Sequence, residues 1–231
     1  MGKQATASAP QTAHSIQQAL ALHQNGRLAE AERIYLSVLT VDPANFDALH
    51  LRGVLKHQQG SSAEGLRLVA AALKAQPGSP DALINHGVIL DALKRHQEAL
   101  ASFDKVLSIR GADATAHYNR GNALQGLGRH AEALTSYDRA ISLAAGQVEA
   151  LYNRGNTLCA LGRHSDALGD YDQVLALEPR HAKALNRRGI ALGALKQSEL
   201  ALAAYDAALA RSRTTNRCSP TQPLTRLGGA S

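Results

Sequence analysis

The sequence predicts an all-α fold in which similar helical units stack into a solenoid. The clearest observation is repetition: Tyr-Asn-Arg-Gly-Asn at 118–122 returns at 152–156, and Leu-Gly-Arg-His at 127–130 returns at 161–164. Both strings are displaced by 34 positions, and a fixed period of this length is typical of stacked helical repeats rather than of one globular core. The second observation is composition. The chain is rich in Ala and Leu, with no Trp and only 2 Phe and 6 Tyr, which favours helices over sheets.

Residues 1–11 are small and polar with one proline, and we expect them to form a disordered N-terminal lead. The repeats follow without insertion or deletion, so the predicted repeat domain spans residues 12–211. We expect six repeats, at residues 12–45, 46–79, 80–113, 114–147, 148–181 and 182–211. After residue 211 the apolar periodicity stops, and residues 212–231 are predicted to be a disordered C-terminal tail.

Each repeat divides into two predicted helices whose apolar residues recur three and four positions apart. The first helix has a small residue at its eighth place, where two helices must approach closely: Ala19, Gly53, Gly87, Gly121, Gly155 and Gly189. The second helix carries a small residue followed four places later by a large apolar or aromatic one: Tyr35, Val69, Phe103, Tyr137, Tyr171 and Tyr205. These two series predict that the helices of each repeat pack face to face.

The turns between the two helices are also recognisable. Glycine stands at the expected end of the first helix in four repeats, where a left-handed cap is least costly: Gly26, Gly60, Gly128 and Gly162. Lys94 and Lys196 take this place in the other two repeats. Pro43, Pro77 and Pro179 mark the end of second helices, because proline cannot continue a helix.

With small residues at places 8 and 20, an aromatic at place 24 and proline at place 32, the chain resembles the tetratricopeptide repeat (TPR) family. The resemblance extends to bacterial TPR proteins and to the repeat half of O-GlcNAc transferases. It implies a right-handed superhelical solenoid whose first helices line a concave groove that holds peptides. No Ser-His-Asp set, paired carboxylates or phosphate-binding glycine loop stands out in the sequence, so we expect no enzyme activity.

Bulk properties exclude several other functions. The formal charge is +6, but Arg211, Arg213, Arg217 and Arg226 lie in the last 21 residues. Residues 1–210 therefore carry 21 basic against 19 acidic residues, or +2, which lacks the basic stripe that nucleic-acid binding requires. Two cysteines at unrelated positions favour neither a disulfide framework nor a metal site, and no cofactor is expected. No apolar run has the length of a signal peptide core or a membrane span, so we predict a cytoplasmic protein without membrane contact.

Asparagines at corresponding places of the first helices are the leading candidates for peptide binding. The sixth place holds Asn85, Asn119 and Asn153, which we call the asparagine ladder, and Asn122 and Asn156 lie three residues further along the same face. An amide offers both a donor and an acceptor, so it can bond the backbone of an extended peptide. The alternative is that these amides only bond neighbouring repeats, since a buried amide needs a partner.

Lys183 and Arg187 form a second candidate, because they lie four residues apart on one predicted helix next to the repeats that hold Asn122 and Asn153. The chain resembles chaperone adaptors of the family here, in which a Lys-x-x-x-Arg pair with asparagines holds an acidic C-terminal segment. One expected lysine of that arrangement is Tyr118 in this chain. The alternative is that the two cations are solvated or paired with Glu149.

Two further columns of polar residues are interpreted as structural. Arginines at the seventh place of four repeats match aspartates on second helices, and we expect ion pairs along the stack: Arg52, Arg120, Arg154 and Arg188 with Asp104, Asp138, Asp172 and Asp206. His96, His130 and His164 recur at the turns, about one repeat apart, which is too far to share one metal ion. We interpret them as packing residues.

The last predicted helix has no capping helix after it, so self-association through its uncovered face is expected unless a partner covers it or the chain is a truncated or frameshifted fragment. The most probable reading from sequence is a non-catalytic scaffold that binds a peptide or partner protein. The alternative is the substrate-recruiting repeat half of an O-GlcNAc transferase-like enzyme, either truncated or acting with a separate catalytic chain. A coding frame for a catalytic domain beyond the stop codon would favour that alternative.

Overall fold

A computed structural model describes residues 9–144 and 146–217, and the side chains of residues 10–144 and 146–211. Within these ranges the chain forms twelve α-helices and no strand. The first helices of the six repeats are α1 Ala9–Gln24, α3 Phe46–Gln58, α5 Pro80–Ala92, α7 Ala114–Gly126, α9 Val148–Ala160 and α11 Ala182–Ala194. The second helices are α2 Leu28–Val41, α4 Ser62–Ala75, α6 His96–Ile109, α8 His130–Leu143, α10 His164–Leu177 and α12 Ser198–Arg217. The all-α helical-repeat prediction is confirmed.

The first helices of repeats 2 to 6 begin at the predicted residues, but α1 begins earlier than predicted. It starts at Ala9 instead of Thr12, so the last part of the expected N-terminal lead is helical. Pro10 explains the difference, because its fixed φ and missing N–H suit the first turn of a helix. Residues 1–8 of that lead lie outside the described residues.

The last helix, α12, ends later than predicted. It continues to Arg217, six residues beyond the expected boundary at 211. Residues 212–217 contain neither glycine nor proline, and the first residue that a helix cannot accommodate is Pro220. Loss of the apolar period at residue 211 therefore did not end the helix. The rest of the predicted tail, residues 218–231, lies outside the described residues.

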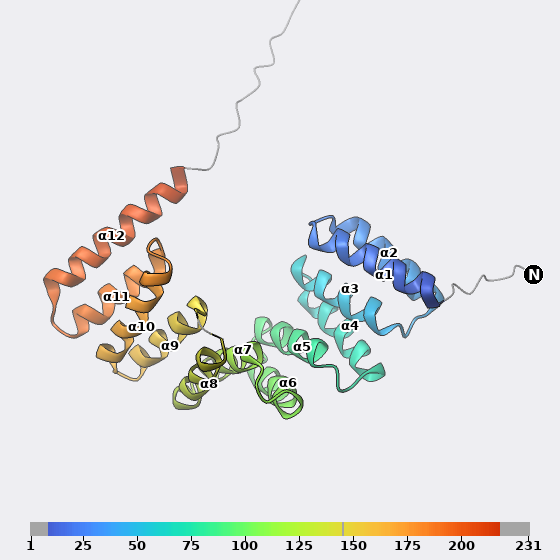
Figure 1. The fold of residues 1–231 in the computed structure, drawn as a ribbon, viewed down its shortest axis with the longest axis horizontal. Coiled ribbons are helices and arrows are strands. Elements are labelled where there is room, and N and C mark those ends of the chain that lie inside the picture. The colour runs from blue at the N-terminus through green and yellow to red at the C-terminus, as the bar shows by residue number, and fades with distance from the viewer. Residues whose placement is uncertain (1–8, 145, 218–231) are drawn as a thin grey trace, which may run out of the picture. The chain divides into compact units, whose positions relative to one another are not determined.

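The two helices of a repeat lie side by side, as Figure 1 shows for α7 and α8, and their closest approach is at the predicted glycine. A Cβ atom added to Gly121 would lie 2.5 Å from Cε1 of Tyr137, which is buried. The equivalent contacts join Gly87 to Phe103, Gly155 to Tyr171 and Gly189 to Tyr205, at 2.6 to 2.8 Å. In these four repeats the absence of a side chain lets the aromatic ring fill the space between the helices, whereas repeat 1 packs Tyr35 in a core that contains Ala19 at this place.

The turns adopt the backbone that the glycine pattern predicted. Gly26, Gly60, Gly128 and Gly162 all have positive φ, between 72° and 84°. Lys94 and Lys196 adopt the same conformation at 62° and 61°, which costs a residue with a Cβ atom about 1 kcal/mol. The repeat geometry thus determines the backbone at these two lysines against their local preference.

The chain divides into two compact units, Met1–Ala145 and Gly146–Ser231. We call them the N-terminal unit, which holds α1 to α8, and the C-terminal unit, which holds α9 to α12. The core of the N-terminal unit includes Leu90, Phe103 and Leu124, packed around Tyr137. In the C-terminal unit, Leu192 packs with Ala201 and Ala204.

Candidate functional site

Lys183 and Arg187 lie one turn apart on α11, and both side chains are exposed. Among the described residues neither forms an ion pair, so the expected alternative of a salt bridge to Glu149 is not found. Two like charges four positions apart on a helix repel each other. The C-terminal unit therefore exposes two adjacent cations that no described carboxylate compensates.

The two candidate asparagines of the C-terminal unit, Asn153 and Asn156, lie on α9, which contacts α11. Asn156 is half-buried, and its Oδ1 accepts a hydrogen bond of 3.0 Å from the hydroxyl of Tyr171. Burial raises the pKa of Tyr171, which keeps this hydroxyl protonated as the donor. Asn153 is half-buried, and its backbone carbonyl accepts a bond from Thr157.

In the N-terminal unit, the ladder residue Asn85 bonds a neighbouring repeat. Its Nδ2 lies 2.8 Å from Nε2 of His50 on α3. Burial lowers the pKa of His50, which favours a neutral imidazole whose Nε2 can accept this hydrogen bond. Asn85 therefore bonds a neighbouring repeat, which is the alternative to peptide binding that the sequence left open.

The other two asparagines of the N-terminal unit lie on α7 and differ in their contacts. Asn122 accepts a hydrogen bond of 2.8 Å from the hydroxyl of Tyr137, whose second partner is Gln125. Asn119 is half-buried, and its amide has no hydrogen-bond partner among the described residues. Of the asparagines in this unit, Asn119 retains its full capacity for bonding a ligand.

The arginine and aspartate columns pair as predicted at two repeat junctions. Arg120 bonds Asp104 and Arg188 bonds Asp172, each at 2.7 Å. Arg52 instead bonds two glutamates, Glu32 and Glu64. These contacts support the interpretation of the columns as structural.

Arg154 forms an ion pair that the column pattern did not predict. It donates two hydrogen bonds to Asp170 of its own repeat from Nε and Nη2, and Nε lies 2.9 Å from Oδ2. The side chain of Asp170 is only 3% exposed. Serines occupy the equivalent places of repeats 3 and 4, Ser102 and Ser136, and the other repeats have apolar residues there, so the sequence signal was a single charged residue among uncharged ones.

The recurring histidines lie at the turns, as predicted. Nδ1 of His96 lies 2.6 Å from Oδ1 of Asp91, and its ring packs against Gly126 of the next repeat. Nδ1 of His130 and of His164 is buried without a hydrogen-bond partner in the part of the chain that the structure describes. No group of three or more His, Cys, Asp or Glu among those residues could hold a metal ion.

No helix formed by residues 9–144 or 146–217 combines the length and apolar character that spanning a membrane requires.

Paired helices that recur every 34 residues with a glycine-to-aromatic contact define a helical-repeat protein. Tetratricopeptide repeat models match residues 112–178, and also 16–80, 51–116 and 152–216. The chain therefore belongs to the tetratricopeptide repeat family, and this membership supports a protein-interaction scaffold. A search of curated proteins found no match.

Solved structures of other TPR proteins share the fold. PilW, described as a widely conserved type IV pilus biogenesis factor, matches with a TM-score of 0.77 at 19% identity, over 94% of this chain and 97% of that chain. A TPR protein from Parabacteroides merdae gives 0.68 at 20% identity, over 90% and 82%. YrrB, described as a TPR protein with an unusual peptide-binding site, gives 0.64 at 21% identity, over 78% and 92%.

Proposed function

We propose that this chain is a non-catalytic scaffold whose first helices bind a peptide segment of a partner protein. In the C-terminal unit the binding face consists of Lys183 and Arg187 on α11 with Asn153 and Asn156 on α9. In the N-terminal unit the corresponding first-helix residues are Asn85, Asn119 and Asn122, of which Asn119 is the leading ligand contact.

The observation that carries this proposal is the exposed pair of cations on α11. Because like charges at this spacing destabilise a helix by about 0.2–0.5 kcal/mol, the pair has a local cost that no described carboxylate offsets. A carboxylate from a partner would remove that repulsion and form charge-assisted hydrogen bonds with both side chains. We therefore expect an acidic segment, with its C-terminal carboxylate at Lys183 and Arg187.

The neighbouring amides on α9 suit the backbone of the same segment. Asn156 uses its Oδ1 to accept from Tyr171, so its Nδ2 donors are available to a peptide carbonyl. The description of YrrB as a peptide-binding TPR protein supports this class of ligand, although its identity to this chain is only 21%.

Replacing both cations by alanine should weaken binding of an acidic peptide at least tenfold, because each charge-assisted bond contributes about 1.5 kcal/mol or more. The probe is a short peptide ending in two glutamates with a free carboxyl terminus, and the measurement is isothermal titration calorimetry. Arg180→Ala with Lys196→Ala is the matched control, since it removes two exposed cations from the same unit. Equal losses in both double variants, or no loss in either, would contradict the proposal.

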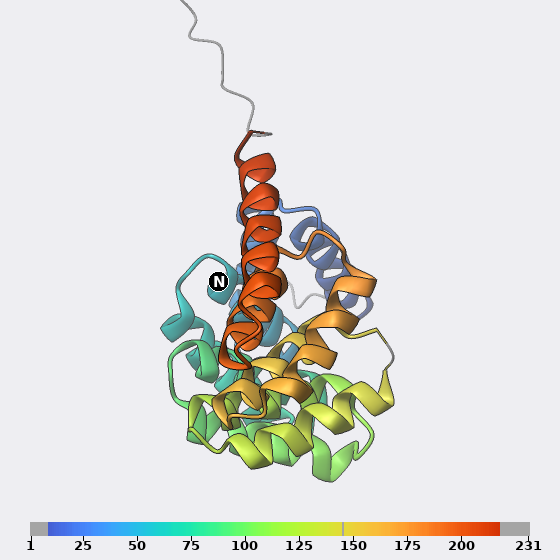
Figure 2. The same cartoon turned by 90° about the vertical axis from the view of Figure 1, so that its left-hand side faces the viewer.

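We also propose that α12 pairs with α12 of a second copy. In Figure 2 no other helix of the C-terminal unit lies in front of α12, and Leu202 is 64% exposed, whereas its equivalent Leu100 is 3% exposed. The first helix of the N-terminal unit, α1, is more polar, because His14 and Gln18 are exposed on it. Pairing of two α12 faces therefore buries more apolar surface than stacking of α12 on α1.

Light scattering should give the mass of a dimer for the native chain and of a monomer for Leu202→Glu with Leu209→Glu. The reason is that two buried carboxylates oppose the apolar contact. Leu36→Glu, at an exposed leucine of α2, should leave the dimer intact. A native chain that is monomeric at high concentration rules out this pairing.

The O-GlcNAc transferase-like alternative and the cytoplasmic location stay predictions.

A further inference from the structure

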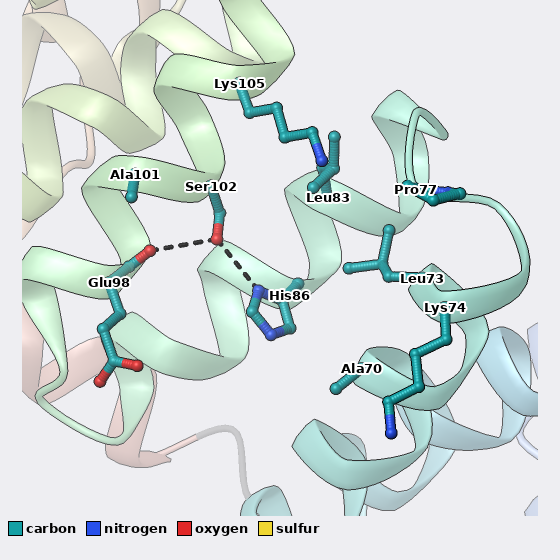
Figure 3. A pocket seen from close by; sticks show the side chains of 10 residues that line it. All are labelled: Ala70, Leu73, Lys74, Pro77, Leu83, His86, Glu98, Ala101, Ser102 and Lys105. Atoms are coloured by element: carbon teal, nitrogen blue, oxygen red, sulfur yellow. Dashed lines mark hydrogen bonds between the residues drawn. The ribbon is translucent and has the colours of Figure 1, made fainter.

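A hollow of about 460 Å³ lies between the second helices of repeats 2 and 3, in the N-terminal unit. Its walls come from α4, α5 and α6, and Figure 3 shows His86 between Ser102 of α6 and the residues of α4. Five of its ten lining residues are apolar: Ala70, Leu73, Pro77, Leu83 and Ala101. The volume is in the range of sites that hold small ligands or single large side chains.

Two departures from the repeat pattern remove an ion pair from this part of the repeat junction. Ala70 and His86 occupy the places that Asp104 and Arg120 hold one repeat later, where the two form an ion pair. The equivalent hollow in repeats 3 and 4 measures about 580 Å³, and Arg120, Asp138 and Arg139 lie in its wall beside Leu107. The hollow of repeats 2 and 3 therefore differs from the next one in the charge of its wall, because it lacks the arginine and the aspartate.

Two polar groups of this pocket, the hydroxyl of Ser102 and Nδ1 of His86, bond each other. The Ser102 hydroxyl donates to the carbonyl of Glu98 at 3.1 Å, so the 3.0 Å bond between Ser102 and Nδ1 of His86 requires Nδ1–H as the donor. Burial lowers the pKa of His86, in agreement with a neutral ring. A neutral imidazole held in this way presents its ring to the pocket without adding charge.

The rim of the pocket is positively charged. Lys74 and Lys105 are both exposed and form no ion pair among the described residues. The one carboxylate of the lining, Glu98, is bonded by Arg95 through both oxygens at 2.6 Å. An occupant would thus meet an apolar floor and two uncompensated ammonium groups.

We propose that this pocket binds a peptide segment in which one bulky apolar side chain is flanked by acidic residues. The apolar side chain packs against Leu73 and Leu83, and the flanking carboxylates lie at Lys74 and Lys105. This site is on the N-terminal unit and involves none of the first-helix residues assigned to peptide binding above. It gives the scaffold a second recognition point, with a preference for apolar side chains that the asparagines do not supply.

The test uses the full chain and the peptide acetyl-Glu-Glu-Phe-Glu-Glu-amide, followed by fluorescence anisotropy of a labelled peptide at low salt. Ala70→Asp with His86→Arg introduces the ion pair that the next repeat contains, so the fold is retained while the pocket becomes charged. We expect at least a fivefold loss of affinity in this variant. The same peptide with alanine in place of phenylalanine should lose affinity to a similar extent in the native chain.

Further variants separate this site from the one on α11. Lys183→Ala with Arg187→Ala should bind the phenylalanine peptide as the native chain does, whereas Lys74→Glu with Lys105→Glu should abolish binding. The latter pair is exposed, so it stays informative if circular dichroism shows that the Ala70→Asp, His86→Arg variant does not fold. Unchanged affinity in the Lys74→Glu, Lys105→Glu variant, or a loss only in the Lys183→Ala, Arg187→Ala variant, overturns the proposal.

Discussion

Replacing Gly121 by valine is expected to lower the free energy of unfolding by about 3 kcal/mol, the upper part of the usual cost of overpacking a core. A Cβ at this position would already lie 2.5 Å from the ring of Tyr137, and valine adds two further methyl groups. The ring is fully buried and cannot move aside without opening the repeat. Urea denaturation followed by circular dichroism measures the change.

Gly169→Ala is the matched control, because Gly169 lies inside α10 and an added Cβ would meet no atom within 4 Å. Removing the conformational freedom of glycine there should raise stability by about 0.5–1 kcal/mol. If the two substitutions shift the urea midpoint in the same direction, the glycine contact does not determine how the helices pack.

The second large effect is expected for Arg154→Ala, which should cost about 3 kcal/mol. The carboxylate of Asp170 is 3% exposed, and this substitution removes both hydrogen bonds from Arg154 while leaving the charge buried. The other contacts of Arg154 are lost as well. Thermal and urea unfolding of the variant at neutral pH give the measurement.

Asp170→Ser identifies the buried charge as the cause. Serine occupies the equivalent place one repeat earlier, where the hydroxyl of Ser136 bonds Arg120 at 2.7 Å. Asp170→Ser alone should therefore be mild, and adding it to Arg154→Ala should recover most of the lost stability, because no charge remains unpaired. A double variant that is less stable than Arg154→Ala would show that the cost arises elsewhere.

Most of the fold could be predicted from sequence because its determinants are local and repeated. Glycine opposite an aromatic residue recurs at a constant interval, and each instance reinforces the others, as at Gly121 and Tyr137. The positive φ of Lys94 was predictable for the same reason, since four glycines hold the equivalent place. The end of α12 was not predictable from periodicity, because a helix can continue beyond the last residue of its apolar pattern.

The candidate site was less predictable, because whether a candidate side chain is available to a ligand depends on which other side chains lie within hydrogen-bonding distance of it. Asn85 has a partner in His50, 35 residues away, and one column of asparagines in the sequence contains both bonded and unbonded amides. Asp170 is the one charged residue at its place in the repeat, and it forms an ion pair with Arg154. The pocket beside His86 is formed by residues of three helices, so the sequence alone could not show that the missing ion pair leaves an uncharged wall there.

The central claim is that the first helices of the C-terminal unit bind an acidic peptide. The most direct measurement is a titration of the ¹⁵N-labelled chain with the peptide ending in two glutamates, followed by amide chemical shifts. The account predicts that the shifts are concentrated on α9 and α11, and strongest near Lys183 and Arg187. No shifts at millimolar peptide, or shifts confined to α10 and α12, would contradict it.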